Sequence, residues 1–233
     1  MKRPFPLSPI AALLLALPVL AGCAGRFDLG AAPAARPDGD GERAILDVSR
    51  VLQDGWRHLP VRGTTDFRIA IVDRALAVSA TGAGGASGLI RPVEADPERC
   101  RTLRWQWRVD LRTKQGDDVG ASVFVLFGDP GMMSAPTAVP TLKYVWAGGD
   151  LQAGEMLPNP YLPDSVMNVV VATADAPLGQ WRWEERDLLA DYEAAFGGSP
   201  EDWIHAIALF TDNDQTGEAV AAHYRSIRLR CDG

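Results

Sequence analysis

The stretch of sequence that decides the fold is residues 101–110, which read RTLRWQWRVD. Its apolar side chains, Leu103, Trp105, Trp107 and Val109, alternate with polar ones. Successive side chains of a β-strand point to opposite faces, so an alternation with a period of two predicts a strand. One face of this strand is apolar and the other is polar and basic, which is typical of a strand that is buried on one side.

Further short runs rich in β-branched and aromatic residues follow along the chain, and Gly, Pro, Asn and Asp separate them. Such runs with turn residues between them predict additional strands. We expect them at residues 67–72, 76–80, 87–93, 122–127, 142–147, 167–173, 181–188, 204–210 and 223–229.

One helix is expected near residues 191–196, with Asp191 as its N-cap and Gly197 and Gly198 at its end. No alternation of strands and helices appears, which argues against a doubly wound nucleotide-binding fold. About ten strands and one short helix predict an all-β protein, an antiparallel β-sandwich or jelly roll.

The N-terminus carries the signals of a bacterial lipoprotein. Residues 1–23 begin with Lys2 and Arg3, continue through an apolar run and end in LAGC. The run is shorter than the about 20 residues that cross a bilayer, but it fits a secretory signal peptide. LAGC matches a lipobox, so we expect cleavage after residue 22 and lipidation of Cys23; the alternative is an ordinary signal peptide with a chance cysteine. Ala24 after the cysteine favours the outer membrane, with the folded domain periplasmic or extracellular.

Residues 23–43 are rich in Ala, Pro, Gly and Asp and predict a flexible tether, followed by one domain over residues 44–233. Removal of Lys2 and Arg3 leaves 21 basic against 30 acidic residues, a net charge of −9. Such a charge argues against a nucleic-acid partner, which would need a basic surface.

Two cysteines remain in the expected mature chain. Cys100 precedes the run at 101–110, and Cys231 ends the run at 219–230. An oxidising compartment permits a disulfide between them if the two runs are neighbouring strands. The spacing alone leaves a disulfide and free thiols equally open.

The most ligand-like loop is residues 211–218, TDNDQTGE. Asp212, Asp214 and Glu218, together with the hydroxyl of Thr216, form a partial set of the oxygen ligands that Ca²⁺ prefers. The alternative is a hairpin turn in which Asp and Asn side chains bond to nearby backbone.

Asp117 and Asp118 offer a second acidic pair. Two carboxyl groups can act as acid and base at a glycosidic bond, although neighbours in a strand point to opposite faces. The alternatives are a solvated turn, or an ion pair of one acid with Arg104 or Arg108 across the sheet.

Aromatic side chains suggest a sugar site. Tyr144 and Trp146 share one face of their predicted strand, and Arg108 or Gln106 would lie nearby if the strands are adjacent. Sugar-binding sandwiches combine aromatic faces with planar polar groups. The alternative is that these aromatic residues fill the interior. The candidate ligand-binding residues are therefore Arg108, Asp117, Asp118, Tyr144 and Trp146, and no residue is assigned as catalytic.

An ordered series of motifs resembles the domain of unknown function 3047 family, from about Val51 to Leu229. The motifs are LRWQWRV at 103–109, DD at 117–118, VFVLF at 123–127, LKYVW at 142–146, GQW at 179–181, DY at 191–192 with FG at 196–197, and TDNDQT at 211–216. The resemblance implies a secreted β-rich bacterial protein and no established activity. Ser122 and Asp187 stand where members tend to carry Arg and Asn.

The leading hypothesis is an outer-membrane lipoprotein whose domain binds a carbohydrate-like or other polar ligand without catalysis. One alternative is a hydrolase or lyase that acts on envelope polysaccharide through carboxylates such as Asp118 and Asp212. Another is a structural or assembly lipoprotein that contacts an envelope protein, with Trp203 or Tyr161 at the interface.

Overall fold

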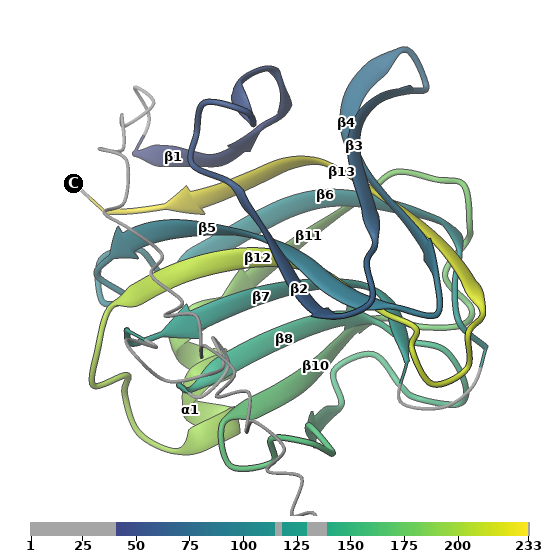
Figure 1. Cartoon of the computed structure of the whole chain (residues 1–233). Helices are drawn as coiled ribbons and strands as arrows, with labels where there is room; N and C mark the ends of the chain where they lie inside the picture. Colours follow the sequence, from purple (N-terminus) through teal and green to yellow (C-terminus); the bar gives the residue numbers. More distant parts are fainter. Residues whose placement is uncertain (1–40, 115–117, 130–138, 233) are drawn as a thin grey trace, which may run out of the picture.

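Two β-sheets pack face to face in the computed structural model of the chain (Figure 1). The structure describes residues 41–114, 118–129 and 139–232. The expected signal peptide, Cys23 and Asp117 lie outside the described residues. Among the described residues, no helix is long and apolar enough to cross a membrane.

The first sheet, sheet A, has six strands in the order β11-β6-β13-β4-β3, with β1 also paired to β13. All its pairings are antiparallel. Its strands are β1 (Glu42–Asp47), β3 (Asp66–Val72), β4 (Ala75–Ala83), β6 (Thr102–Leu111), β11 (Arg182–Asp187) and β13 (Ala219–Arg230).

The second sheet, sheet B, has seven strands in the order β2-β5-β12-β7-β8-β10-β9. One pairing, between β8 and β10, is parallel, so this sheet is mixed rather than purely antiparallel. Its strands are β2 (Arg57–Arg62), β5 (Ala86–Ala95), β7 (Val119–Phe127), β8 (Thr141–Trp146), β9 (Met156–Pro158), β10 (Val166–Ala172) and β12 (Ile204–Asp212).

The predicted fold class is confirmed, and each predicted run forms a strand. Three strands were not predicted. β1 contains Glu42 and Arg43, which were expected in the tether. β2 contains Pro60 and is mostly exposed, and β9 has only three residues, so neither shows the alternation that marks a strand.

Large aromatic side chains from both sheets meet in the core. Trp105 and Trp107 of β6 are fully buried and lie against β8 of the other sheet. Ring centroids are 5.1 Å apart between Trp105 and Tyr144, and 5.5 Å apart between Trp107 and Trp146. Aromatic pairs at such distances add to the free energy that area burial already supplies.

The helix is α1 (Leu188–Phe196), and its N-cap differs from the prediction. Asp187, not Asp191, is the N-cap, and its carboxylate accepts hydrogen bonds from the backbone of Leu189 and Ala190. Asp191 lies in the first turn instead. Gly197 follows the helix with φ of +76°, a conformation that glycine adopts without strain. A short 3₁₀ helix, η1 (Val48–Arg50), follows β1.

Cys100 and Cys231 form a disulfide, which settles the alternative that spacing left open. β6 and β13 are neighbouring strands, so the two cysteines beside their ends are close in space. The bond closes a segment of 131 residues and fixes the end of β13 to the start of β6.

We expect replacement of both cysteines by serine to lower the free energy of unfolding by about 2–5 kcal/mol, because the unfolded chain regains the freedom that the cross-link removes. Urea unfolding under oxidising conditions measures this change. Addition of a reductant should destabilise the unchanged protein by a similar amount and leave the double variant unaffected. Equal unfolding midpoints for the two proteins would contradict the prediction.

Candidate functional site

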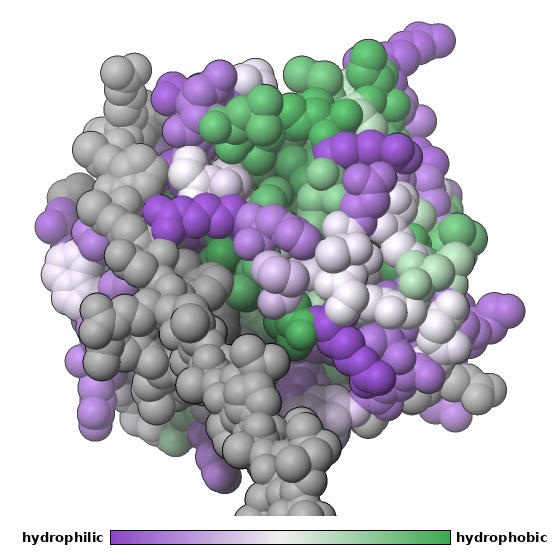
Figure 2. Space-filling view, in the orientation of Figure 1, coloured by the Kyte–Doolittle hydropathy of each residue, from purple (hydrophilic) through white to green (hydrophobic). Residues whose placement is uncertain are grey.

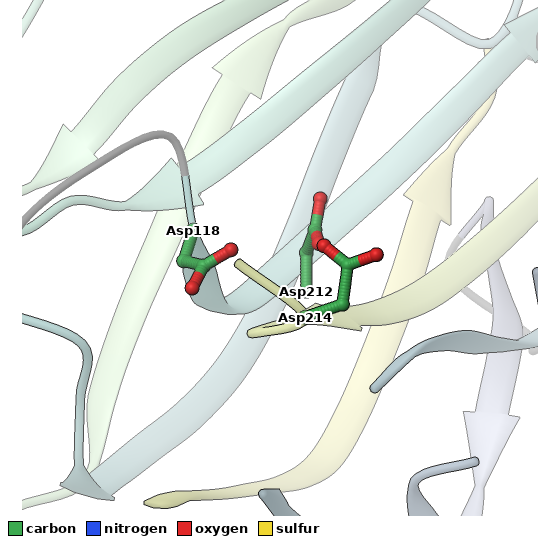
Figure 3. A group of neighbouring side chains, drawn as sticks. All are labelled: Asp118, Asp212 and Asp214. Atoms are coloured by element: carbon green, nitrogen blue, oxygen red, sulfur yellow. The ribbon is translucent and has the colours of Figure 1, made fainter. Parts of the chain in front are cut away.

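Three carboxylates from distant parts of the chain converge at one end of sheet B (Figure 3). Asp118 comes just before β7, Asp212 ends β12, and Asp214 lies in the turn that follows. One oxygen atom of each lies within 4.8 Å of one oxygen of the others. The antiparallel register of β7 and β12 places Val119 opposite Asp212, which explains why these segments meet. We call Asp118, Asp212 and Asp214 the carboxylate cluster.

Asp118 is buried, and both oxygen atoms of its carboxylate accept hydrogen bonds from the turn after β12. It accepts hydrogen bonds from the backbone of Gln215 at 3.3 Å, from the backbone of Thr216 at 2.7 Å and from the hydroxyl of Thr216 at 2.5 Å. A carboxylate that accepts several such bonds stabilises the turn more than a neutral acceptor would.

The other two carboxylates lie beside cations. The ammonium group of Lys143 is 3.9 Å from Asp212, and the guanidinium of Arg62 is 3.2 Å from Asp214. These cations offset much of the negative charge that would attract a metal ion. The cluster still offers the hard oxygen atoms that Ca²⁺ takes as ligands.

Glu218, a predicted metal ligand, is not part of the carboxylate cluster. Its carboxylate accepts a hydrogen bond from the backbone of Lys114 at 2.7 Å. Asn213 is fully buried and ties the same turn to β5, because its side chain accepts from Gly85 and donates to the carbonyl of Glu218. Much of this loop is therefore structural, as the turn interpretation required.

Lys143 lies on the outer face of sheet B, the face turned away from sheet A, since its neighbour Tyr144 points into the core. Its side chain is 3% exposed, and its ammonium group is 5.5 Å from the ring centre of Phe124 and 6.0 Å from that of Phe210. A cation over aromatic faces is favourable. Lys143 was not among the predicted site residues, although a single Lys within the apolar run LKYVW was a usable signal.

Tyr144 and Trp146, two predicted ligand-binding residues, fill the interior instead. Both are fully buried between the sheets, so they present no aromatic face to a ligand. The hydroxyl of Tyr144 donates to Asp191 at 2.8 Å, and Arg186 pairs with the same carboxylate. Burial, and then the negative charge of Asp191, raises the pKa of Tyr144 well above its usual value. This phenol therefore stays a neutral donor that joins β8 to α1.

Arg108, another predicted ligand residue, lies on the other sheet from Tyr144 and on its outer face. It belongs to β6 of sheet A and points outward, because Trp107 beside it points inward. Its guanidinium pairs with Asp110 at 2.6 Å and with Asp73 at 2.5 Å, and the hydrogen bond to Asp110 raises its pKa. Burial opposes ionisation of Asp110, but Arg108 and His223 outweigh it and hold the pKa of that carboxyl below its usual value. The alternative in which Asp118 forms an ion pair with Arg104 or Arg108 is therefore wrong, since both arginines pair with other carboxylates.

A pocket of about 200 Å³ opens beside Trp203, at the opposite end of β12 from the carboxylate cluster. Trp203 directly precedes β12, and 54% of its surface is exposed. The pocket is also lined by Arg43, Glu94, Asp96, Arg99 and the Cys100–Cys231 disulfide. We call it the Trp203 pocket. Trp203 was expected only as an interface residue, and the pocket was not predicted from the sequence.

A β-bulge shapes this pocket. Ile204 pairs with Ala95 and Ala206 pairs with Pro92, so β5 contains one more residue than β12 at this point. Glu94 lies in the bulge with φ of +49°, a conformation that is uncommon for residues other than glycine. Bulges redirect side chains and occur often beside binding sites.

Basic side chains of the Trp203 pocket are held in place by backbone carbonyl groups. The guanidinium of Arg43 donates to the carbonyl groups of Glu94 and Val93. Burial lowers the pKa of Arg43, and the nearby charge of Arg91 lowers it further. Arg99 donates to the carbonyl of Asp232 at 3.3 Å, so the end of the chain helps to fix it.

The sequence model of the family described as "Protein of unknown function (DUF3047)" matches residues 54–228. No curated protein matches the chain in sequence.

Among solved structures, the chain is similar to a metagenome-derived glycoside hydrolase family 12 endoglucanase, with a TM-score of 0.46, 13% identity and coverage of 87% of this chain and 96% of that one. It is also similar to the xyloglucanase domain of NopAA from Sinorhizobium fredii, with a TM-score of 0.45, 9% identity and coverage of 87% and 100%. The glycoside hydrolase domain of Endo-D from Streptococcus pneumoniae R6 gives a TM-score of 0.38 and 11% identity, covering 75% of this chain but only 21% of that one. Likenesses this distant carry no argument about function. The residues of the site are therefore the only guide to function.

We expect weak Ca²⁺ binding at the carboxylate cluster, with a Kd near the ~10⁻⁴–10⁻³ M of extracellular Ca²⁺ modules, because Lys143 and Arg62 compete for the same oxygen atoms. At tenfold excess over Kd, binding adds about 1.4 kcal/mol and raises Tm by about 3–6 °C. Calorimetry with and without CaCl₂ measures this shift. Asp212→Asn should abolish it, and an unchanged Tm for the unaltered protein would contradict Ca²⁺ binding.

Proposed function

We propose a function for this chain, which belongs to the DUF3047 family of proteins of unknown function. Its domain binds a carbohydrate-like ligand without cleaving it. One observation carries the proposal: an exposed tryptophan stands beside a pocket lined by charged groups of both signs. The ligand enters the Trp203 pocket, not the face that Tyr144 and Trp146 were expected to form.

The chemistry of this pocket supports a sugar ring. The face of Trp203 offers an apolar platform, and Arg43 and Arg99 supply planar donors. Glu94 and Asp96 supply acceptors for hydroxyl groups. Because acidic and basic groups are mixed, a neutral polyhydroxylated ring suits the lining better than a strongly charged ligand does.

The size of the pocket supports recognition of a single ring. Its volume of about 200 Å³ is below the roughly 300–1,000 Å³ of pockets that enclose drug-sized ligands. A single sugar at the end of a chain fits this hollow better than the middle of a polymer, which needs an open groove.

The position of the carboxylate cluster supports a non-catalytic role. Asp212 lies nine residues after Trp203, at the far end of β12, so at ~3.4 Å per residue the two sites lie roughly 31 Å apart. Glycosidases place two carboxyl groups on either side of the scissile bond. The cluster lies too far from the Trp203 pocket to do this for a ring bound there.

The same proposal places the domain at the outer membrane, held by lipid on Cys23 through the tether before β1. We expect radiolabelled palmitate to mark the unchanged protein and not Cys23→Ser, because the thiol of Cys23 is the acceptor. Membrane fractionation should then find the variant outside the outer-membrane fraction. Labelling of the variant would contradict the proposed anchor.

Trp203→Ala should weaken binding to an oligosaccharide at least tenfold, since buried aromatic contacts often dominate recognition. An array of neutral oligosaccharides selects the probe, and isothermal titration calorimetry measures Kd for the selected compound.

Trp183→Ala is the matched control. Trp183 is also exposed, but it lies on β11 of sheet A beneath the guanidinium of Arg104. This variant should bind like the unchanged protein. Equal Kd values for Trp203→Ala and the unchanged protein would exclude the Trp203 pocket as the ligand site.

A further inference from the structure

The hairpin formed by β3 and β4 exposes apolar side chains on one face. Ile71 is 76% exposed and lies opposite Leu76, which is also exposed. Ile69 is two residues from Ile71 on the same strand, so it points to the same side. β3 is an edge strand of sheet A, and Figure 1 shows that the hairpin projects beyond the sandwich.

A fourth exposed apolar side chain, Leu52, lies in a segment next to this hairpin. β1 and β4 pair with successive parts of β13, and η1 after β1 contacts β4. Leu52, in the turn after η1, is almost fully exposed. Figure 2 shows apolar residues gathered across the upper part of this view, over η1 and the hairpin. We call Leu52, Ile69, Ile71 and Leu76 the apolar surface.

The charges around the apolar surface are mostly paired, with one cation at its tip. Asp73 and Arg74 form the two-residue loop of the hairpin, and Asp73 pairs with Arg108. Asp66 and Arg68 pair with each other at 3.4 Å. None of the ion pairs found among the described residues involves Arg74. An apolar surface tipped by a cation fits the boundary between acyl chains and anionic headgroups.

The tether keeps this surface close to a bilayer. Gly41 lies eighteen residue steps after Cys23, so the connection spans at most about 63 Å at ~3.5 Å per residue. A domain of this size has a diameter of about 40 Å from the usual scaling of the radius of gyration. Gly41 leads directly into β1, which lies along the edge of β13 that also holds β4. Such confinement gives the domain a high effective concentration at the bilayer. Even a surface with low affinity for lipid then contacts the bilayer.

We propose that the apolar surface docks on the phospholipid bilayer that holds the lipid anchor. This inference rests on the anchor proposed above and is independent of the sugar ligand. Docking fixes the orientation of the domain, so the hairpin faces the lipid while the rest of the sandwich faces the aqueous space.

Hydrogen exchange on the mature lipoprotein tests the docking. The protein is anchored to vesicles of phosphatidylethanolamine and phosphatidylglycerol, and a protease site placed in the tether releases the same folded domain for comparison. Amides of β3 should exchange at least tenfold more slowly in the anchored protein than in the released domain. Equal rates in the two states would overturn the proposal.

Paired variants separate docking from other effects. Ile71→Glu with Leu76→Glu should abolish the difference between anchored and released protein, because glutamate opposes entry into an anionic interface. Leu157→Glu, which introduces the same side chain at one exposed position of β9 in sheet B, should preserve it. Failure of the protein to attach to vesicles would show that the anchor is wrong. Protection of the released domain that grows with protein concentration would identify a second copy as the partner and overturn docking on lipid.

Discussion

The packing of Trp105 and Trp107 against Tyr144 and Trp146 is the constraint on which the remaining structure depends. These rings join the centres of the two sheets and fix which side of β6 and β8 faces inward. Because side chains alternate along a strand, every neighbour of these residues must then point outward. The outward positions of Arg108 on sheet A and Lys143 on sheet B follow directly. A change in register by one residue would reverse both faces, so the core determines the chemistry of the two surfaces.

Local patterning was sufficient to predict most strands and the end of the helix, but not their partners. Residues 101–110 alternate clearly, and β6 follows that alternation with a buried face and a polar face. β2 could not be found this way, because it pairs only with β5 and exposes most of its side chains, so neither face selects apolar residues. Nor could periodicity show that β6 and β8 belong to opposite sheets, so the position of Arg108 near Tyr144 stayed conditional on adjacent strands. The N-cap was placed at Asp191 for a similar reason: both Asp187 and Asp191 suit a cap, and only the tertiary contact between Asp191 and Tyr144 distinguishes them.

The candidate sites show the same limit. Asp118 was selected as part of an acidic pair and Asp214 as part of the acidic loop 211–218, and the register between β7 and β12 brings them together with Asp212. Glu218 was included because of its position in the loop, but the backbone of Lys114 takes its carboxylate. The Trp203 pocket depends on a bulge in β5, on the end of β13 and on a disulfide between distant segments. No short stretch of sequence contains all of these features, so a search for local motifs could not reveal the pocket.

The Trp203 pocket and the apolar surface are connected through the last strand of the chain. β13 ends beside the pocket at Cys231, whose backbone N–H donates to the carbonyl of Gly41 at 2.9 Å. β4 pairs with the first half of β13 and β1 with its last residues, so the hairpin and the point where the tether joins share one strand with the pocket. A rigid strand linked by a disulfide transmits orientation better than a loop does. If the hairpin rests on the bilayer, the mouth of the Trp203 pocket is therefore held at a fixed angle to the bilayer. Its distance from the bilayer is also limited by the length of the tether. Such a geometry favours ligands that are themselves attached to, or enriched near, the same surface, because a freely diffusing ligand would gain nothing from a binding site held in one orientation.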